Sequence, residues 1–421
     1  MDFITEWDAS AHVGGGEVTG GEVRSVYQAF VRVSDGRKLR GRRYEAALVL
    51  TLLLLGKLAG EQTLAGIAQW VRERQSLLGQ WLPLPRTPCA NTYRYVCAHV
   101  DAQELFAAMT SVLGAAMGAA PPAETLAETP AEMPAEMPAE MPLRHLACDG
   151  KELRGSHRLT GDGVQAAQGV LGIYDTANDR MAALLPIAGK GFESKALQAW
   201  LAEQALKKGL AGCLLTADAL HTQSAVCKAI RTAGADYLLV AKRNQRSLRE
   251  DIAYLFSQAP DFWFPERKTR RVNAGHGRIE LCTLRASDEL NGYLADRWPG
   301  VQQVFQIVRT VTRRSRHGVK TTSEVVYGLT SVPASCASPT QLLTWLRTHW
   351  RIENRSHWRR DATLGEDRLQ LASKPAVLVL AVLNCTILAL LDRLHVTNCR
   401  QAMRRFNAHP EQALTLLCQP L

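Results

Sequence analysis

A proline repeat divides this chain into two parts that cannot share a continuous helix. Between Ala123 and Pro142 the sequence repeats the motif AETP or AEMP, and from Pro130 onwards a proline occupies every fourth position. Proline has no backbone N–H and clashes with the preceding helical turn, so this segment cannot be one helix. We therefore predict an extended, solvated linker over residues 121–142, with a domain on either side.

The linker also hides part of the basic character of the chain. It contains five Glu and no Lys or Arg, so the net charge of +10 becomes +15 for the other residues. Such an excess favours a polyanion partner, because each phosphate neutralised by a cation releases condensed counterions. Charge alone does not establish that partner, since many basic proteins never meet nucleic acid.

Composition excludes several classes of protein. With 46% apolar residues in 421, the chain can bury substantial cores, which argues against a disordered or fibrous protein. The ten Cys include no C-x-x-C pair, which indicates reduced thiols in a cytosol and neither a zinc knuckle nor a disulfide framework. No signal pattern opens the chain, and the apolar runs 46–55 and 376–391 are shorter than the roughly 20 residues that span a bilayer. We expect buried helices and no membrane partner.

The part before the linker has the apolar spacing of helices. We expect a flexible leader over residues 1–40 and a helical domain over 41–120. One helix face would consist of Leu64, Ile67, Ala68 and Val71. After a proline-rich break, Asn91 would cap a second helix carrying Arg94 and Tyr95. Two helices with a tight connection could be a helix-turn-helix DNA reader, or a small helical domain without DNA contact.

After the linker, strands and helices alternate. The expected strands are 143–148, 170–174, 181–187, 213–216 and 237–241, and the expected helices are 194–207 and 223–233. The runs 301–312 and 319–330 predict a long hairpin. Its tip could grip phosphate or be merely solvated, and it carries Arg313, Arg314, Arg316, His317 and Lys320. Helical spacing resumes at Pro339. This order predicts a mixed sheet flanked by helices, an α/β fold.

Two acidic residues follow predicted strands. Asp149 directly follows the first strand in HLACDGKELRGS, and Asp218 lies just past another in CLLTADALHTQ. Open sheets present catalytic groups at strand ends, although a carboxylate there can also cap a helix or form a turn.

A third element runs from Arg347 to Leu371 without internal proline, and we expect it to be mainly helical. Positions four apart share a helix face, which places in one row His349, Glu353, His357 and Asp361. The neighbouring row contains Trp350, Asn354 and Trp358, and we interpret both tryptophans as core residues rather than base-stacking groups. An apolar core helix would not normally carry the first row, so this helix is a candidate site.

Three carboxylates suit phosphodiester chemistry with two divalent ions. Mg²⁺, with Mn²⁺ as a substitute, prefers hard oxygen ligands, so Asp149 would bridge both ions while Asp218 and Glu353 each hold one. A zinc site of His349, Glu353 and His357 is an alternative, but the sequence lacks H-E-x-x-H. A glycosidase using two of the carboxylates is another, and the basic excess argues against it.

With these motifs, the chain resembles the insertion-sequence DDE transposases, specifically the H-repeat-associated subgroup linked to Rhs elements. Five motifs occur in the family order: DGKELRGS, TADALHTQ, YLLVAKRNQRSL, GHGRIE and RTHWRIENRSHWRRDATLGED. The family's Tyr, Arg, Glu and Lys around the catalytic Glu correspond here to Leu346, His349, Glu353 and Arg360. The tyrosine is therefore missing, and Ser194 and Lys195 only partly match a family Lys-Ser block.

The resemblance implies a ribonuclease-H-like catalytic domain over residues 143–371, with a β-rich insertion at about 246–335 and C-terminal helices over 372–421. It implies an associated N-terminal domain that binds DNA. It also implies Mg²⁺-dependent cleavage and strand transfer on double-stranded DNA, at element ends and target, by a homo-oligomer in the cytoplasm at the nucleoid. A catalytically silent DNA-binding derivative and a nuclease without strand transfer are the alternatives.

Further polar side chains are expected to contact DNA around the carboxylates: Lys151, Arg154, His221, Lys242, Asn244, Gln245, His349, Arg351, Asn354, His357 and Arg360. For Lys242, Asn244 and Gln245 a solvated strand end is an equally good interpretation.

Overall fold

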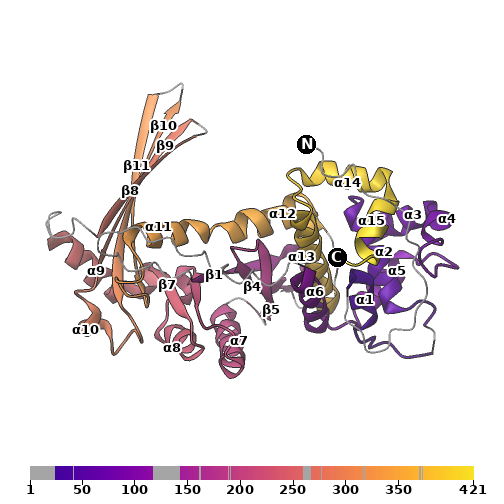
Figure 1. Cartoon of the computed structure of the whole chain (residues 1–421), viewed down its shortest axis with the longest axis horizontal. Helices are drawn as coiled ribbons and strands as arrows, with labels where there is room; N and C mark the ends of the chain where they lie inside the picture. The colour runs from indigo at the N-terminus through magenta and orange to yellow at the C-terminus, as the bar shows by residue number, and fades with distance from the viewer. Residues whose placement is uncertain are drawn as a thin grey trace, which may run out of the picture. The chain divides into compact units, whose positions relative to one another are not determined.

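The computed structural model describes residues 24–40, 42–116, 143–160, 163–187, 189, 191–258, 267–275, 277–315, 318–368, 371 and 373–421. These residues form two compact units (Figure 1). The helical unit takes its described residues from 1–127, 152–169 and 355–421, and the sheet unit takes its own from 128–151 and 170–354. The expected proline linker over 121–142 and most of the expected leader lie outside the described residues.

A nine-stranded mixed sheet organises the sheet unit. Its strand order is β5-β4-β1-β6-β7-β11-β10-β9-β8. The strands are β1 (Arg144–Leu153), β4 (Gln168–Asp175), β5 (Arg180–Ile187), β6 (Cys213–Ala217), β7 (Asp236–Ala241), β8 (Lys268–Gly275), β9 (Arg278–Ser287), β10 (Gln303–Ser315) and β11 (Gly318–Thr330). Strand β6 is parallel to both β1 and β7. The pairs of β7 with β11, β11 with β10, β10 with β9 and β9 with β8 are antiparallel. The predicted mixed sheet is confirmed.

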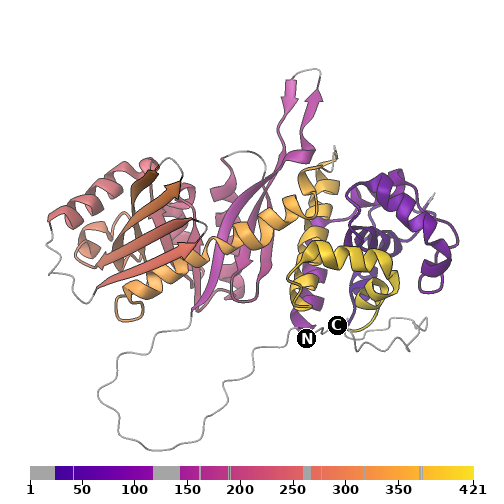
Figure 2. The same ribbon diagram turned by 90° about the horizontal axis from the view of Figure 1, so that it is seen from above.

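Helices cover both faces of this sheet because successive strand residues point to opposite sides. On β6, Leu215 packs with α7 (Glu193–Lys207), α8 (Ser224–Thr232) and α9 (Arg246–Gln258). Its neighbour Leu214 belongs to the core on the other face, which includes Leu342 and Trp345 of α11 (Pro339–Thr348). Figure 2 shows α11 lying across that face. A short helix, α10 (Asn291–Leu294), precedes β10.

The predicted strands agree with the observed ones, with one informative exception. Strand β1 continues to Leu153, so Asp149 lies inside this strand rather than directly after it. The reason is that β1 extends beyond its partner β6, which ends at Ala217. The long hairpin is confirmed as β10 and β11, whereas Arg316 and His317 at its tip lie outside the described residues.

The helical unit is built from segments at both ends of the chain. Its helices are α1 (Val26–Val31), α2 (Ala46–Leu58), α3 (Leu64–Glu73), α4 (Gln75–Leu78), α5 (Ala90–Cys97), α6 (Ala102–Ala116), α12 (Trp358–Ala362), α13 (Lys374–Arg393), α14 (Cys399–Ala408) and α15 (Pro410–Cys418). The unit also contains two short strands, β2 (Arg158–Thr160) and β3 (Gly163–Gln165), and the one-turn helices η1 (Arg154–Ser156) and η6 (Glu366–Arg368).

Helix α13 is longer than the apolar run 376–391 suggested. It has 20 residues, and by length and composition it is the one helix among the described residues that could cross a membrane. However, 67% of its apolar window is buried, and it packs against α5 and α6. We therefore assign it to the interior of this unit.

The N-terminal helices differ from the helix-turn-helix expectation. The predicted apolar face of α3 is buried, but Cys89 rather than Asn91 is the N-cap of α5. Cys89 has an extended backbone, and its carbonyl accepts hydrogen bonds from the Thr92 and Tyr93 N–H groups, so Asn91 already lies in the first turn. Helix α4 and residues 79–89 separate α3 from α5, so the connection is not tight.

Candidate active site

The sheet places Asp149 beside Asp218. Cys148 on β1 pairs with Ala217 on β6 in parallel register; Asp149 is the next residue of β1, and Asp218 is the first residue after β6. Neighbouring strands lie about 4.8 Å apart, so the two carboxylates project from adjacent positions. Asp218 also caps a one-turn helix, η2 (Ala219–His221), because its Oδ1 accepts the Leu220 N–H at 3.0 Å. The capping and ligand interpretations of this residue are therefore compatible.

Glu353 reaches the same place from the helix after α11. It lies in η5, a π-helical segment at Ile352–His357. A ligand oxygen of Glu353 and one of Asp149 lie within 4.8 Å of each other, close enough to share a metal ion. Glu353 is exposed and Asp149 is half-buried. Short π-helical segments inside helices often occur at functional sites, because they displace one side chain from the regular helical row.

A hydrogen-bonded chain connects the three elements that carry these acids. The Thr216 hydroxyl on β6 bonds to His145 Nε2 on β1 at 2.8 Å and to His349 Nδ1 at the end of α11 at 2.9 Å. Thr176 Oγ1 bonds to the other ring nitrogen of His145 at 3.1 Å. Burial, together with the nearby His349, lowers the pKa of His145 to about 3, so this ring is neutral. These hydrogen bonds hold the end of α11 against β1 and β6.

Two further side chains lie near the aspartates: His221, which was predicted from the sequence, and Glu193, which was not. His221 Nε2 is 3.9 Å from Asp218 Oδ1, and burial lowers the pKa of His221 although Asp218, Glu193 and Asp149 attract its proton. Glu193, in the first turn of α7, is near enough to act on His221, and its Cγ would be 3.6 Å from a Cβ on Gly150. Glu193 was missed because acidic residues are common in the first turn of helices, so its position in the sequence did not distinguish it.

The other expected DNA contacts of the sheet unit are placed at its surface. Lys242, Asn244 and Asn354 are exposed. Asn244 Nδ2 donates to the Ala219 carbonyl at 2.5 Å, and Gln245 Nε2 donates to the Thr222 carbonyl at 2.7 Å. These two amides therefore hold the loop after Asp218. Arg351 forms an ion pair with Asp179, which lies in the turn between β4 and β5.

Four of the residues expected to contact DNA are buried in the structure. The buried side chains are Lys151, His221, His357 and Arg360, whereas Arg154 is exposed. Arg360 is 0% exposed, and its Nη2 lies 2.9 Å from Glu366 Oε2. It is thus part of the interior of the helical unit, because the carboxylate that balances it comes from η6. His221 is buried beside Asp218, and His357 is buried as part of the helical unit.

The interpretation of the two tryptophans as core residues is wrong. Trp350 is 63% exposed and Trp358 is 60% exposed. Their row faces solvent together with Asn354, because the apolar residues that anchor this helix, such as Ile352, lie on a different side. In the zinc interpretation His349 would have to bind through Nε2, because its Nδ1 bonds to the Thr216 hydroxyl.

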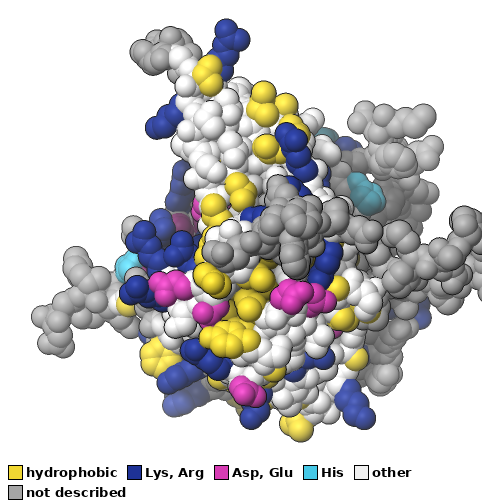
Figure 3. Space-filling view, turned by 90° about the vertical axis from the view of Figure 1, so that its left-hand side faces the viewer, with side chains coloured by type: hydrophobic (Ala, Val, Ile, Leu, Met, Phe, Trp, Pro, Cys, Tyr) yellow, Lys and Arg dark blue, Asp and Glu magenta, His cyan; other side chains and the backbone are white. Residues whose placement is uncertain are grey.

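The projecting end of the sheet is basic. On this face, Lys and Arg (dark blue) lie along the projecting upper part, and Asp and Glu (magenta) gather lower down (Figure 3). The strand register places Arg278, Arg313 and Lys320 side by side across β9, β10 and β11. Like charges directly opposite each other destabilise a sheet, so an anion bound across this row would relieve their repulsion.

Comparison with protein families identifies the chain. The family model described as "Transposase DDE domain" matches residues 140–390, which is more than half of the chain. The chain belongs to the DDE transposase family. The model described as "DDE_Tnp_1-associated" matches residues 27–112 of this transposase, the part that forms α1 to α6. The resemblance to insertion-sequence DDE transposases is confirmed.

Curated relatives agree with this membership. The transposase is 27% identical over 273 residues to an uncharacterized protein encoded in the dhlA 3′ region of Xanthobacter autotrophicus, covering 64% of this chain and 82% of that protein. It is 26% identical to the protein YbfL and 25% identical to the "H repeat-associated putative transposase YhhI", both of Escherichia coli K12. Each of these two matches covers 53% of this chain and 57% of the relative.

Among solved structures, the transposase is similar to a chain in a cryo-EM structure of the piggyBac transposase synaptic complex with hairpin DNA. The TM-score is 0.43 at 10% sequence identity, covering 94% of this chain and 78% of that chain.

Proposed function

We propose that this transposase cleaves DNA at the ends of its element and joins the 3′ ends to target DNA, using Asp149, Asp218 and Glu353 as metal-binding carboxylates. The observation that carries the proposal is the convergence of oxygens from Asp149 and Glu353 within 4.8 Å, beside an aspartate that directly follows the next strand. These acids are far apart in the sequence. Their approach is therefore a product of the fold.

The donor set fits hard divalent ions such as Mg²⁺ or Mn²⁺. All three proposed ligands offer carboxylate oxygens, and Mg²⁺ needs few of them because it keeps several waters. Glu193 adds a fourth carboxylate whose Oε2 is buried and has no hydrogen-bond partner among the described residues. A buried carboxylate oxygen without a partner is costly unless a cation or water satisfies it. When bound, such ions stabilise charge on the attacking and leaving oxygens of a phosphodiester.

The chain's own residues would keep this site in place. The sheet order β5-β4-β1-β6-β7 supports a ribonuclease-H-like core, with β8 to β11 as the insertion between Asp218 and Glu353. The Thr216 hydroxyl, by linking His145 and His349, would hold the Glu353 helix at the right height above the two aspartates. A neutral His221 beside Asp218 would offer a hydrogen bond there without adding a positive charge beside the carboxylates.

DNA phosphates would be held by exposed cations of the two units. Arg154, Lys242 and the row of Arg278, Arg313 and Lys320 are the side chains we assign to phosphate contact. Exposed Trp350, four residues before Asn354, is placed where a base could stack on it. Joining ends to a target requires several DNA segments at once, so we expect a homo-oligomer assembled on DNA in the cytoplasm.

The test uses a duplex carrying the DNA that flanks the gene. Asp149→Asn, Asp218→Asn and Glu353→Gln should each abolish Mg²⁺- or Mn²⁺-dependent cleavage and leave duplex binding near the wild-type level. They should also reduce Mn²⁺ binding measured by electron paramagnetic resonance. Asp296→Asn is the matched control, because Asp296 is an exposed carboxylate of the same unit.

Unchanged cleavage in one variant would remove that residue from the site. If the wild type binds flanking DNA but never cuts it, the protein is a DNA-binding derivative rather than an enzyme. Cleavage without joining to a second duplex would instead identify a nuclease.

A further inference from the structure

A cleft in the helical unit carries a concentration of positive charge. Its volume is about 640 Å³, and it lies between the loop before α2 and the start of α5. Six cations line it: Arg37, Lys38, Arg40, Arg42, Arg43 and Arg94. Asn91, Thr92 and Tyr95 contribute polar and aromatic surface, and no acidic side chain is part of the lining.

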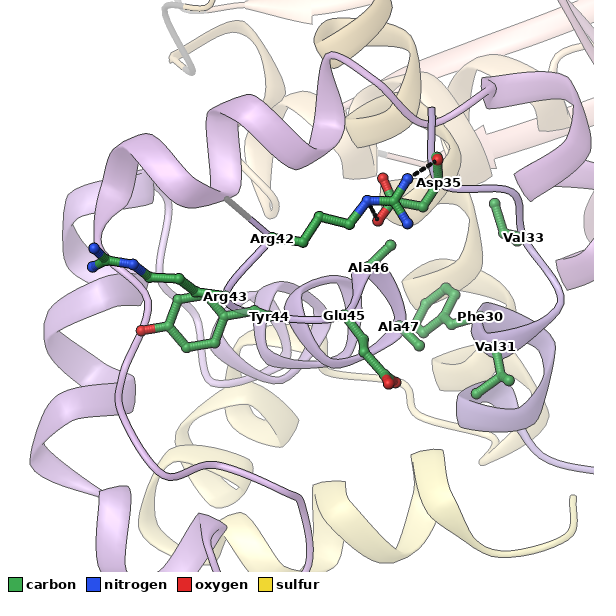
Figure 4. Close-up of a pocket in the computed structure, with 10 residues that line it drawn as sticks. All are labelled: Phe30, Val31, Val33, Asp35, Arg42, Arg43, Tyr44, Glu45, Ala46 and Ala47. Carbon is green, nitrogen blue, oxygen red and sulfur yellow. Dashed lines mark hydrogen bonds and ion pairs between the residues drawn. The ribbon is translucent and has the colours of Figure 1, made fainter. Parts of the chain in front are cut away.

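Two of these cations have a structural role. Arg37 is buried and pairs with Asp35 at 2.6 Å, and its Nη2 also donates to the Tyr44 carbonyl. Arg42 lies 3.6 Å from Asp35 and donates to the Asp35 carbonyl. Figure 4 shows Arg42 turned towards Asp35, with Arg43 and Tyr44 pointing the other way. Asp35 therefore stabilises the loop before α2 through its ion pairs with Arg37 and Arg42.

The other four cations are left without acidic partners. Lys38, Arg40, Arg43 and Arg94 are exposed, and among the described residues no carboxylate lies within ion-pair distance of any of them. The only side-chain bond of Arg94 within this part of the structure goes to the neutral Asn91 Oδ1, at 3.1 Å. Four like charges around one hollow repel each other unless an anion occupies it.

The start of α5 adds to the attraction for anions. Cys89 is the N-cap of this eight-residue helix, whose N-terminal end carries a partial positive charge beside the cleft. Cys89 is exposed, and hydrogen bonds from the Thr92 hydroxyl and nearby N–H groups lower the pKa of its thiol.

We propose that this cleft binds the phosphodiester backbone of DNA, as a second DNA contact separate from the carboxylate site. The inference rests on the proposed function for the identity of the anion. A backbone fits better than a small anion because the cations extend around a wide hollow and Tyr95, 51% exposed, provides an aromatic surface beside them. Such a contact holds DNA without reading its sequence.

The experiment measures binding of a short random-sequence duplex, and of a single strand of the same length, to the full chain at several salt concentrations. Arg40→Gln combined with Arg43→Gln should weaken binding and reduce the slope of log affinity against log salt by roughly 2, since each phosphate contact contributes about 0.9. Arg72→Gln combined with Arg404→Gln is the matched control, because it removes the same charge from exposed sites outside the cleft. It should change the slope by less than half as much.

Cys89 gives an independent readout. It is the only exposed cysteine of the ten, and it lines the cleft. Bound duplex or single strand should slow its alkylation by iodoacetamide, measured by peptide mass spectrometry, and the Arg40 and Arg43 double variant should lose this protection. Protection by only one of the two DNA forms would identify which backbone the cleft accepts.

Equal slopes in the test and control variants, or an alkylation rate unaffected by either DNA, would overturn the proposal. Protection by inorganic pyrophosphate but not by DNA would do the same. These results do not depend on cleavage. Failure of the proposed function would appear as a wild type that binds DNA and does not cut it, whatever the outcome at Cys89.

Discussion

A buried lysine in the helical unit should make stability depend on pH in an unusual direction. Lys57, in the last turn of α2, is 1% exposed, and its Nζ donates to the Leu364 carbonyl at 3.4 Å. Burial lowers its pKa from 10.5 to about 8, although the nearby Glu366 opposes the shift. Since one pKa unit corresponds to ~1.4 kcal/mol, the charged form costs the fold roughly 3 kcal/mol.

The sign follows from proton linkage. Below about pH 8 the lysine is charged in both the folded and the unfolded chain, so the full cost destabilises the fold. Between pH 8 and 10.5 the unfolded chain binds more protons, so the free energy of unfolding rises with pH. Above 10.5 both forms are neutral and the cost has disappeared.

Lys57→Met removes this ionisation and keeps the apolar stem. The unfolding free energy of the variant minus that of the wild type should fall by roughly 3 kcal/mol between pH 7 and pH 10.5. Urea denaturation followed by far-ultraviolet circular dichroism measures this difference. Loss of the bond to Leu364 shifts the whole curve equally at every pH, so the slope alone tests the reasoning.

Lys374→Met is the control, because Lys374 is an exposed lysine of the same unit. Its difference from the wild type should stay nearly constant over the same range. A constant difference for Lys57→Met, or one that grows with pH, would refute the assigned burial cost.

Three further changes test the interior and the site. Arg360→Met should destabilise the helical unit by about 3–5 kcal/mol because it leaves Glu366 buried without its ion-pair partner, and adding Glu366→Leu should restore most of the melting temperature. Thr216→Val should lower the cleavage rate with unchanged DNA affinity, and Thr216→Ser, which keeps the hydroxyl, should recover it; equal losses in both would point to packing alone. Glu193→Gln should weaken Mn²⁺ binding by about tenfold or more, and an unchanged Mn²⁺ titration would exclude Glu193 from the metal site.

Local patterns were enough to predict much of the fold. The strands and the hairpin were predicted to within a few residues, because a short apolar run bounded by turn residues is visible in the local sequence. The five motifs were likewise sufficient to predict the family, which the family model confirms over residues 140–390. Asp149, Asp218 and Glu353 could be singled out in advance because carboxylates beside buried strands, or on a polar helix stripe, are locally unusual.

Local patterns could not determine which helix faces are buried. Arg360 and Trp358 lie on the same short helix, yet Arg360 is fully enclosed and Trp358 is 60% exposed, the reverse of what their chemistry suggests. The decisive partner of Arg360 is Glu366, which η6 brings to it. No periodicity encodes that pairing.

The sequence by itself determined most of the elements, their order and the membership of this chain in the DDE transposase family. Only the tertiary structure decided which side chains meet. It brought Glu193 beside the aspartates, joined His145 to His349 through one hydroxyl, and gathered exposed arginines around a cleft next to Cys89. The physical reason is that burial and electrostatic environment depend on packing between segments distant in the chain, whereas propensity and periodicity depend only on near neighbours.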